Sequence, residues 1–246
     1  MPYFDGFVIP VPTANKDKFI AHAETGDAVF IEHGATRVVE CWGEDVKHGK
    51  VTDFYGAVDA KEDETIVFSW IEWPDKATRD KGMAAMMDPE NPDPRMDPAQ
   101  NPMPFDGKRM IYGGFDPLVL EGDRTALPYV QGFIVPVPRD KREEYRKVAS
   151  EAWEQLFQPY GALCVLEAWG DDVPHGEVTD FYRAGKATEE EGVVFSFMAW
   201  PSREACDAAA ERMQNDPDMK MPEGGMPFDG MRMIYGGFAP IVKLGE

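Results

Sequence analysis

The sequence contains two long segments that return almost unchanged after about 125 residues. Residues 42–55 (WGEDVKHGKVTDFY) return as residues 169–182 with 11 of 14 positions identical, and residues 103–119 return as residues 226–242 with 14 of 17 identical. This period is far longer than the roughly 20–50 residues of a solenoid repeat, and it matches a whole small domain. The chain is therefore a duplicated domain, which predicts an internal copy of a two-fold homodimer.

The duplication sets the expected domain boundaries. We expect one domain over residues 1–122 and a second over residues 127–246, joined by a short linker near residues 120–128. Each half is long enough to bury a hydrophobic core. The short linker implies that the two halves lie side by side.

Each half shows the order strand, helix, strand, strand, helix, strand. In the first half we expect strands over 3–11, 37–42, 65–73 and 108–119 and helices over 13–32 and about 74–87; in the second, strands over 129–137, 163–169, 192–200 and 231–242 and helices over about 140–159 and 202–214. A βαββαβ unit covers one sheet face with its helices and leaves the other open. The sequence therefore predicts an α+β protein, with two ferredoxin-like βαββαβ domains packed sheet to sheet as an intramolecular, pseudo-dimeric α/β barrel.

The charge limits the partners of this chain. Its formal net charge is −20, divided as −11 up to Gly122 and −9 after it, so both halves are acidic. Phosphate contacts need clustered Lys and Arg, which disfavours nucleic acids and anionic membranes. The RNA-recognition fold shares this element order, but strand 67–73 (VFSWIEW) lacks the basic and aromatic pattern of its RNA-contacting strand. We expect a monomer with an internal pseudo-two-fold axis, and higher oligomers stay open.

Several chemistries have no signature here. The first residues lack a basic segment followed by a long apolar run, and none of the three cysteines is duplicated, so a cytoplasmic protein without disulfides is expected. Only one duplicated histidine occurs per half, without an HxxxH or CxxC spacing, so no metal is expected. Phosphate-binding glycine loops and nucleophile motifs are also missing, and no cofactor is expected.

A duplicated carboxylate lies in the second strand of each half. Alternation places Glu40 and Trp42 on one face, with Glu167 and Trp169 as their counterparts. The opposite face is apolar and suits the helices, so we expect these four side chains to point into the barrel.

A carboxylate buried in a barrel needs a partner. The expected ion pairs are Glu40–Arg109 and Glu167–Arg232, which serve either as structural pairs or as the polar floor of a ligand pocket. Trp42 and Trp169, together with both arginines, are the candidate ligand-binding residues. Tyr112 and Tyr235 are expected nearby.

The repeated loop holds the only duplicated histidines, His48 and His175. Each is followed five positions later by an aspartate, Asp53 or Asp180, so a general base with an orienting carboxylate is one interpretation. The other is a solvent-exposed turn in which the aspartate caps backbone N–H groups and the following aromatic residues enter the core.

A proline-rich segment, residues 88–105, precedes the last strand of the first half, and its counterpart is about four residues shorter. It is either a lid over a pocket or a stiff irregular connection. Met83, Met86 and Met87 stand before it at helical spacing and are expected in the core.

Four segments carry a resemblance to a known family: GFVIPVP, VVECWGEDVKHGKVTDF, VFSWIEWP and MPFDGKRMIYGGF. They resemble the YbaA-like proteins, a bacterial family of unknown function, and the match covers nearly the whole chain, once per half. The resemblance implies the dimeric α/β-barrel superfamily and a fused pseudo-dimer. That superfamily includes cofactor-free monooxygenases, small isomerases and haem enzymes, so it implies no single reaction.

Three functions stay open on the sequence alone. The first is binding of a small apolar or aromatic molecule in a barrel-domain pocket. The second is a cofactor-independent oxygenase or isomerase-type enzyme, with proton transfer by Glu40, His48 and Tyr112 or their counterparts Glu167, His175 and Tyr235. The third is a structural or assembly protein with a filled barrel. Differences between the copies, such as Asp116 against Ala239, leave open whether both halves keep a working site or one half is only structural.

Overall fold

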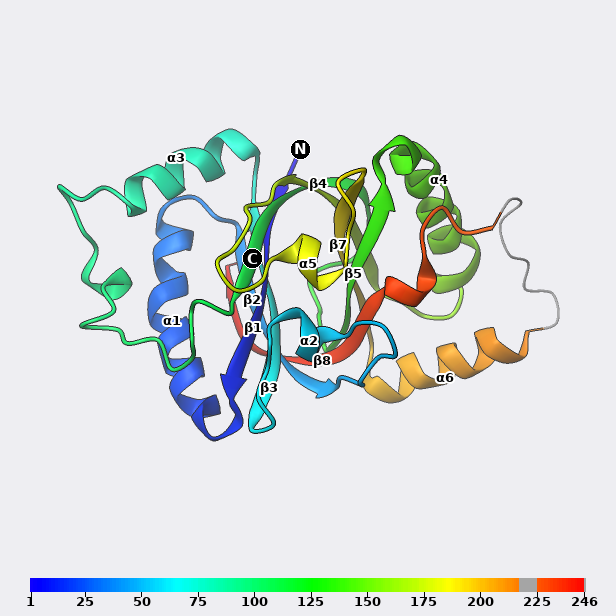
Figure 1. The fold of residues 1–246 in the computed structure, drawn as a ribbon, viewed down its shortest axis with the longest axis horizontal. Helices are drawn as coiled ribbons and strands as arrows, with labels where there is room; N and C mark the ends of the chain where they lie inside the picture. Colours follow the sequence, from blue (N-terminus) through cyan, green and yellow to red (C-terminus); the bar gives the residue numbers. More distant parts are fainter. Residues whose placement is uncertain (217–224, 246) are drawn as a thin grey trace.

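The fold is a closed eight-stranded barrel, seen in a computed structural model that describes residues 1–216 and 225–245 (Figure 1). The strand order around the barrel is β1-β3-β2-β8-β5-β7-β6-β4, and all neighbours are antiparallel. The strands are Tyr3–Pro12 (β1), Arg37–Asp45 (β2), Glu64–Trp73 (β3), Ile111–Gly122 (β4), Tyr129–Pro138 (β5), Cys164–Asp172 (β6), Glu191–Trp200 (β7) and Ile234–Gly245 (β8).

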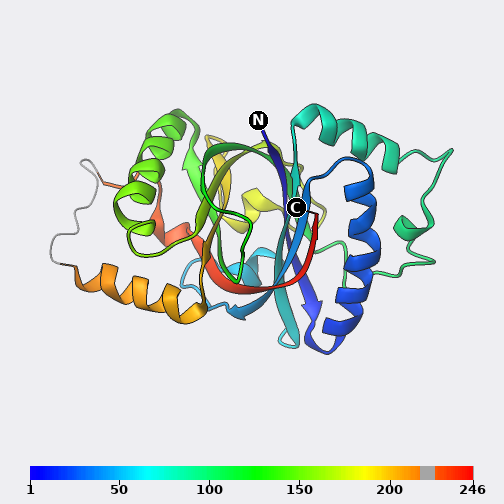
Figure 2. The same ribbon diagram turned by 180° about the vertical axis from the view of Figure 1, so that it is seen from behind.

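Each half supplies four consecutive strands of the barrel, and the seams are the pairs β2–β8 and β4–β6. The helices α1 (Lys16–Glu32) and α3 (Lys76–Met86) cover the outside of the first half, and α4 (Arg142–Ala152) and α6 (Arg203–Asn215) cover the second. Figures 1 and 2 show the two helical layers on opposite sides of the barrel. The predicted pseudo-dimeric α/β barrel is confirmed.

The barrel interior is filled by aromatic side chains from both halves. Phe68 and Phe195 stack across the pseudo-two-fold axis with ring centroids 4.6 Å apart, and Trp70 stacks on Phe197 at 4.1 Å. Gly6 lets the ring of Phe195 approach, because a Cβ there would lie 2.7 Å from it. The packed interior joins the halves into one hydrophobic core.

Two short helices that the sequence did not predict lie at one mouth of the barrel, α2 (Phe54–Ala57) and α5 (Phe181–Ala184) (Figure 1). The side chains of Asp53 and Asp180 cap them, and Phe54 and Phe181 are fully buried in the barrel core. The capping interpretation of both aspartates is therefore confirmed.

Element ends differ from the prediction at turns. Strand β4 begins at Ile111 because Asp106 and Arg109 form a turn before it. Helix α4 ends at Ala152 and continues as a π-helical turn, Trp153–Phe157 (η4), which buries Trp153.

The proline-rich segment lies along α1 as a strap. Asn101 Nδ2 donates to the backbone of His22 and Arg95 pairs with Glu32, while Phe105 contacts Phe19. Part of the corresponding segment of the second half lies outside the described residues. Of the three methionines before the strap, Met86 is buried and Met83 half-buried, but Met87 is 77% exposed, so the core prediction was wrong for Met87.

No helix in the described parts of the chain combines the length and the apolar character that crossing a membrane requires.

Candidate functional site

The predicted direction of Glu40 was wrong. Val39 and Cys41 belong to the barrel core, whereas Trp42 packs with Phe19 of α1, so Glu40 and Trp42 face the helical layer. The same holds for Leu166 and Ala168 against Glu167 and Trp169 in the second half. The reason is that aromatic side chains fill the closed barrel interior, so the apolar face of each strand points inward and the polar face points toward the helices.

The predicted ion pairs Glu40–Arg109 and Glu167–Arg232 are not formed. Arg109 binds Glu64 at 2.6 Å, and Arg232 binds Glu191 at 2.7 Å; both glutamates are the first residues of their strands. Each arginine also donates to a backbone carbonyl, that of Asp59 or Lys186. These two equivalent ion pairs close the loops before β3 and β7, so neither arginine is bonded to Glu40 or Glu167.

Glu40 belongs to a row of side chains that crosses the outer face of the sheet. Register places Tyr112 of β4 opposite Phe7 of β1, Phe7 opposite Ser69 of β3, and Ser69 opposite Glu40 of β2. Tyr112 is 46% exposed, while Ser69 and Glu40 are buried. From the sequence, Tyr112 was expected near Glu40. In the structure Tyr112 instead lies at the open end of the same row, three strand spacings or about 14 Å from Glu40.

Helix α1 adds a second carboxyl, that of Asp27, above this row. Three polar atoms there are sealed from solvent and have no hydrogen-bond partner: Asp27 Oδ2, Glu40 Oε2 and Ser69 Oγ. We call these three residues the acid cluster. Buried polar atoms are normally paired, so three unpaired atoms together make this place a candidate binding site.

Burial and mutual repulsion disturb the acid cluster. Burial raises the pKa of Asp27 to about 7. The pKa of Glu40 also lies well above its usual range, because the carboxyl is desolvated and faces the charge of Asp27. The two groups therefore hold a proton near neutral pH, where ordinary carboxyls are fully ionised.

The equivalent place in the second half is filled. Tyr145, at the position of Phe19, donates its hydroxyl to Glu167 Oε2 at 2.7 Å, and the buried Trp153 stands where the first half has Asp27. Ser196 lies beside Glu167 on β7, as Ser69 lies beside Glu40. The second copy thus keeps the glutamate but supplies its partner from within the chain.

Burial raises the pKa of Glu167 to about 7, which makes stability depend on pH. The folded state binds its proton more tightly than the unfolded state, so this contribution is complete below about pH 4.5 and is lost as pH rises to 7. We expect Glu167→Gln to leave stability at pH 4 nearly unchanged and to raise it at pH 8 by on the order of 2–3 kcal/mol. Urea unfolding at both pH values measures this. The exposed Glu154→Gln is the matched control, and an equal effect at both pH values would contradict the prediction.

The two histidines lie away from the acid cluster, in the loops before α2 and α5. His48 Nδ1 is 3.2 Å from Asp53 Oδ2, its ring packs at a tilt against the ring of Tyr55, and its side chain is 79% exposed. His175 repeats this arrangement with Asp180 and Tyr182. Tyr235 is exposed like Tyr112, so the structure does not bring the six proton-transfer candidates together.

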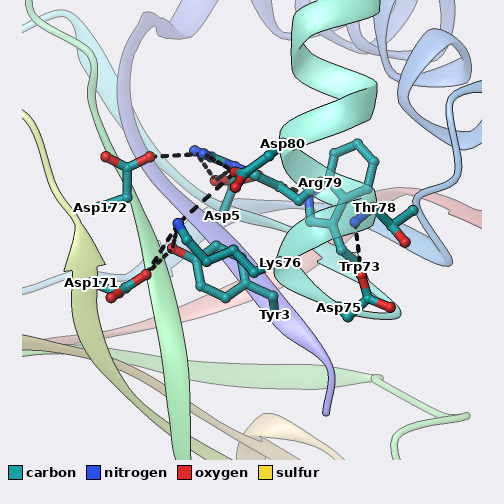
Figure 3. Close-up of polar contacts among 10 residues, drawn as sticks. All are labelled: Tyr3, Asp5, Trp73, Asp75, Lys76, Thr78, Arg79, Asp80, Asp171 and Asp172. Carbon is teal, nitrogen blue, oxygen red and sulfur yellow. Dashed lines mark hydrogen bonds and ion pairs between the residues drawn. The ribbon is translucent and has the colours of Figure 1, made fainter.

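A charged cluster that the sequence did not reveal, buried at Asp5 and Arg79, links the two halves (Figure 3). Arg79 of α3 binds Asp5 of β1 at 2.8 Å, and the indole N–H of Trp73 donates to the same carboxylate. Arg79 also reaches Asp172 of the other half at 2.8 Å, and Tyr3 donates to Asp171. Because these groups have partners within the chain, the cluster is a structural clamp.

Two open hollows of about 600 and 540 Å³ lie at the ends of α1 and α3 and share His33 and Ala85. Charged and small side chains dominate their walls, which gives an apolar ligand little to contact. In the described part of the chain no three His, Cys, Asp or Glu side chains gather as metal ligands.

Comparison with known families identifies the duplication. A family model described as a protein of unknown function, DUF1428, matches residues 2–107 and again residues 128–230. The chain belongs to the DUF1428 family. YbaA, an uncharacterized protein from Escherichia coli K12, is 53% identical over 116 residues, which cover 47% of this chain and 98% of YbaA. YbaA of Shigella flexneri matches equally well. The predicted YbaA-like identity is confirmed, and this DUF1428 chain carries two copies of what YbaA has once.

Solved structures share the fold of this DUF1428 chain at low identity. A "putative monooxygenase" from Lactobacillus acidophilus superposes with a TM-score of 0.57 at 12% identity, covering 99% of this chain and 96% of that one. An anthrone oxidase-like protein superposes with a TM-score of 0.59 at 11% identity, covering 99% and 92%. At such identities the likeness establishes the fold alone.

Proposed function

We propose that the first half binds a small, largely apolar molecule between α1 and the outer face of the sheet, with the polar group of the ligand on the acid cluster. The observation that carries this proposal is the set of three orphaned atoms on Asp27, Glu40 and Ser69. Each buried polar atom left unpaired costs about 1–3 kcal/mol, so a bound molecule that satisfies them gains that free energy.

The surroundings of the acid cluster suit an apolar ligand body. Two hydrophobic clusters meet at this point: one holds Phe19 and Trp42, the other Val29 and Ile71. Phe7 packs against both clusters and stacks on the exposed Tyr112, with ring centroids 6.4 Å apart. A ligand entering past Tyr112 and Phe7 would meet apolar walls before it reaches the carboxyls, which is the usual composition of a small-molecule site.

In our proposal only the first half offers this site, because in the second half the hydroxyl of Tyr145 already satisfies the glutamate. The duplication therefore separates a binding copy from a structural copy. The filled barrel interior supports a structural role for the strands themselves but leaves the helical layer free to hold a ligand.

Transplanting the second half's residues into the first tests this proposal. We expect the double variant Phe19→Tyr/Asp27→Trp to lose ligand binding. Trp153 begins a π-helical turn in the second copy whereas α1 is regular at Asp27, so circular dichroism first checks that the variant folds. Ligand-detected NMR with a fragment set of aromatic alcohols, amides and amines measures binding to both proteins. The control is Glu167→Gln, which changes only the second copy. Equal binding by wild type and the double variant would refute the site.

The second candidate is proton transfer in a cofactor-independent oxygenase or isomerase-type reaction. It is favoured by the pKa of Asp27, about 7, which suits a group that takes and returns a proton at neutral pH. The fold shared with a protein described as a monooxygenase and with an anthrone oxidase-like protein is compatible with it. In this case Asp27→Asn would keep ligand binding and abolish turnover of any bound substrate.

A further inference from the structure

The acid cluster also restricts the chemistry of its ligand. Resting on the proposed function, we infer that the ligand carries a primary ammonium group on an aromatic or aliphatic body, and that this group occupies the space between Asp27, Glu40 and Ser69. The number of orphaned atoms, their chemistry and the local charge each support this inference.

The orphaned atoms call for hydrogen-bond donors. An ionised carboxylate only accepts hydrogen bonds, and a serine hydroxyl can accept one. An ammonium group has three N–H donors and no acceptor, so it can supply one hydrogen to each of Asp27 Oδ2, Glu40 Oε2 and Ser69 Oγ. A ligand hydroxyl has one donor and no charge, so it offers the two carboxylates less than an ammonium group does.

The charge around the acid cluster is not balanced by the chain. In residues 1–216 and 225–245, neither Asp27 nor Glu40 takes part in an ion pair. His22, on the same helix, bonds to Asn101 of the strap at 2.9 Å, and burial lowers its pKa, which favours the neutral ring. Lys243 of the adjacent strand β8 is exposed. Two buried carboxyls without a countercharge are the setting in which a ligand cation gains most, because buried charges require pairing.

The two carboxyls couple binding to proton release. In the free protein burial and mutual repulsion favour the protonated forms of Asp27 and Glu40 at neutral pH. A cation placed between them favours both ionised forms, so its binding must expel protons. A neutral alcohol of the same shape provides no such charge and leaves the protons in place.

Isothermal titration calorimetry at pH 7 tests the inference with 2-phenylethylamine and its uncharged analogue 2-phenylethanol. Each titration is run in phosphate and in MOPS, which differ in ionisation enthalpy and contain no primary ammonium group that could compete for the site. We expect the amine to bind at least ten-fold more tightly than the alcohol and to release protons from both carboxyls, up to two per chain. Asp27→Asn, which keeps the shape but not the charge, is expected to weaken amine binding at least ten-fold, and Phe19→Tyr/Asp27→Trp to abolish it. Glu167→Gln is expected to bind like wild type.

The outcomes separate this inference from the proposed function. If the alcohol binds as well as the amine, with no buffer dependence and with loss in Phe19→Tyr/Asp27→Trp, the site stands and the ammonium inference is overturned. The inference is likewise overturned if alcohols or amides bind at this site and amines do not. If amines bind equally to wild type and to the double variant, both the inference and the site are refuted.

Discussion

Replacement of Phe195 by alanine is expected to lower the free energy of unfolding by about 3–5 kcal/mol, the range for large-to-small substitutions of buried aromatic residues. The ring of Phe195 is fully buried and stacks face to face on Phe68, with ring centroids 4.6 Å apart. It also packs against Phe115, with ring centroids 5.2 Å apart. Phe68 and Phe195 come from different halves, so the substitution weakens the contact that replaces a dimer interface. Chemical unfolding followed by circular dichroism measures the loss.

Gly6 provides an internal control for this prediction. In the wild type a Cβ at Gly6 would lie 2.7 Å from the Phe195 ring, so Gly6→Ala is expected to cost about 1–3 kcal/mol through overpacking. In the Phe195→Ala background the ring is gone, and the same substitution should cost close to nothing. Additive effects of the two substitutions would show that the ring does not pack against β1 as described, since residues in contact are expected to couple.

The fold could be predicted from the sequence because the duplication constrains it at many positions at once. Residues 42–55 and 103–119 fix the repeat, and the element order within one period leaves an open sheet face that only a second copy can cover. The face of each strand was harder to assign. Period-two alternation shows that Glu40 and Trp42 share a face, but it does not say whether that face meets the barrel interior or the helices.

The sequence predicted only part of the acid cluster, for a similar reason. Glu40 was identified from its repeated strand, but Asp27 lies in a helix whose sequence diverged between the copies, where a carboxylate resembles an ordinary surface residue. From the sequence, Arg109 was paired with Glu40, whereas in the structure Arg109 forms its ion pair with Glu64. Both glutamates are strand residues, and only the register and the turn at Asp106 decide which one the guanidinium reaches. Ser69, a single hydroxyl within the apolar strand VFSWIEW, was the one signal that could have been used.

The largest electrostatic effect is expected at the clamp between the halves. Asp5 is 3% exposed, and Arg79 is its charged partner, so Arg79→Met leaves a buried carboxylate without compensation. Breaking such a pair from one side typically costs about 3–5 kcal/mol, far more than loss of a surface pair. Urea unfolding at pH 7 measures this, with Lys81→Met on the exposed side of the same helix as control.

The second half shows how the same place can be built without charge. Gln131 stands where the first half has Asp5 and accepts the indole N–H of Trp200 at 3.0 Å, while Cys206 replaces Arg79. The double variant Asp5→Gln/Arg79→Cys should therefore recover most of the stability lost in Arg79→Met, because it removes both charges and keeps a partner for Trp73. The contact of Arg79 with Asp172 is absent from this variant. If the double variant is as unstable as Arg79→Met, the bond between the halves matters more than the burial of Asp5, and Asp172→Asn alone should then cost as much.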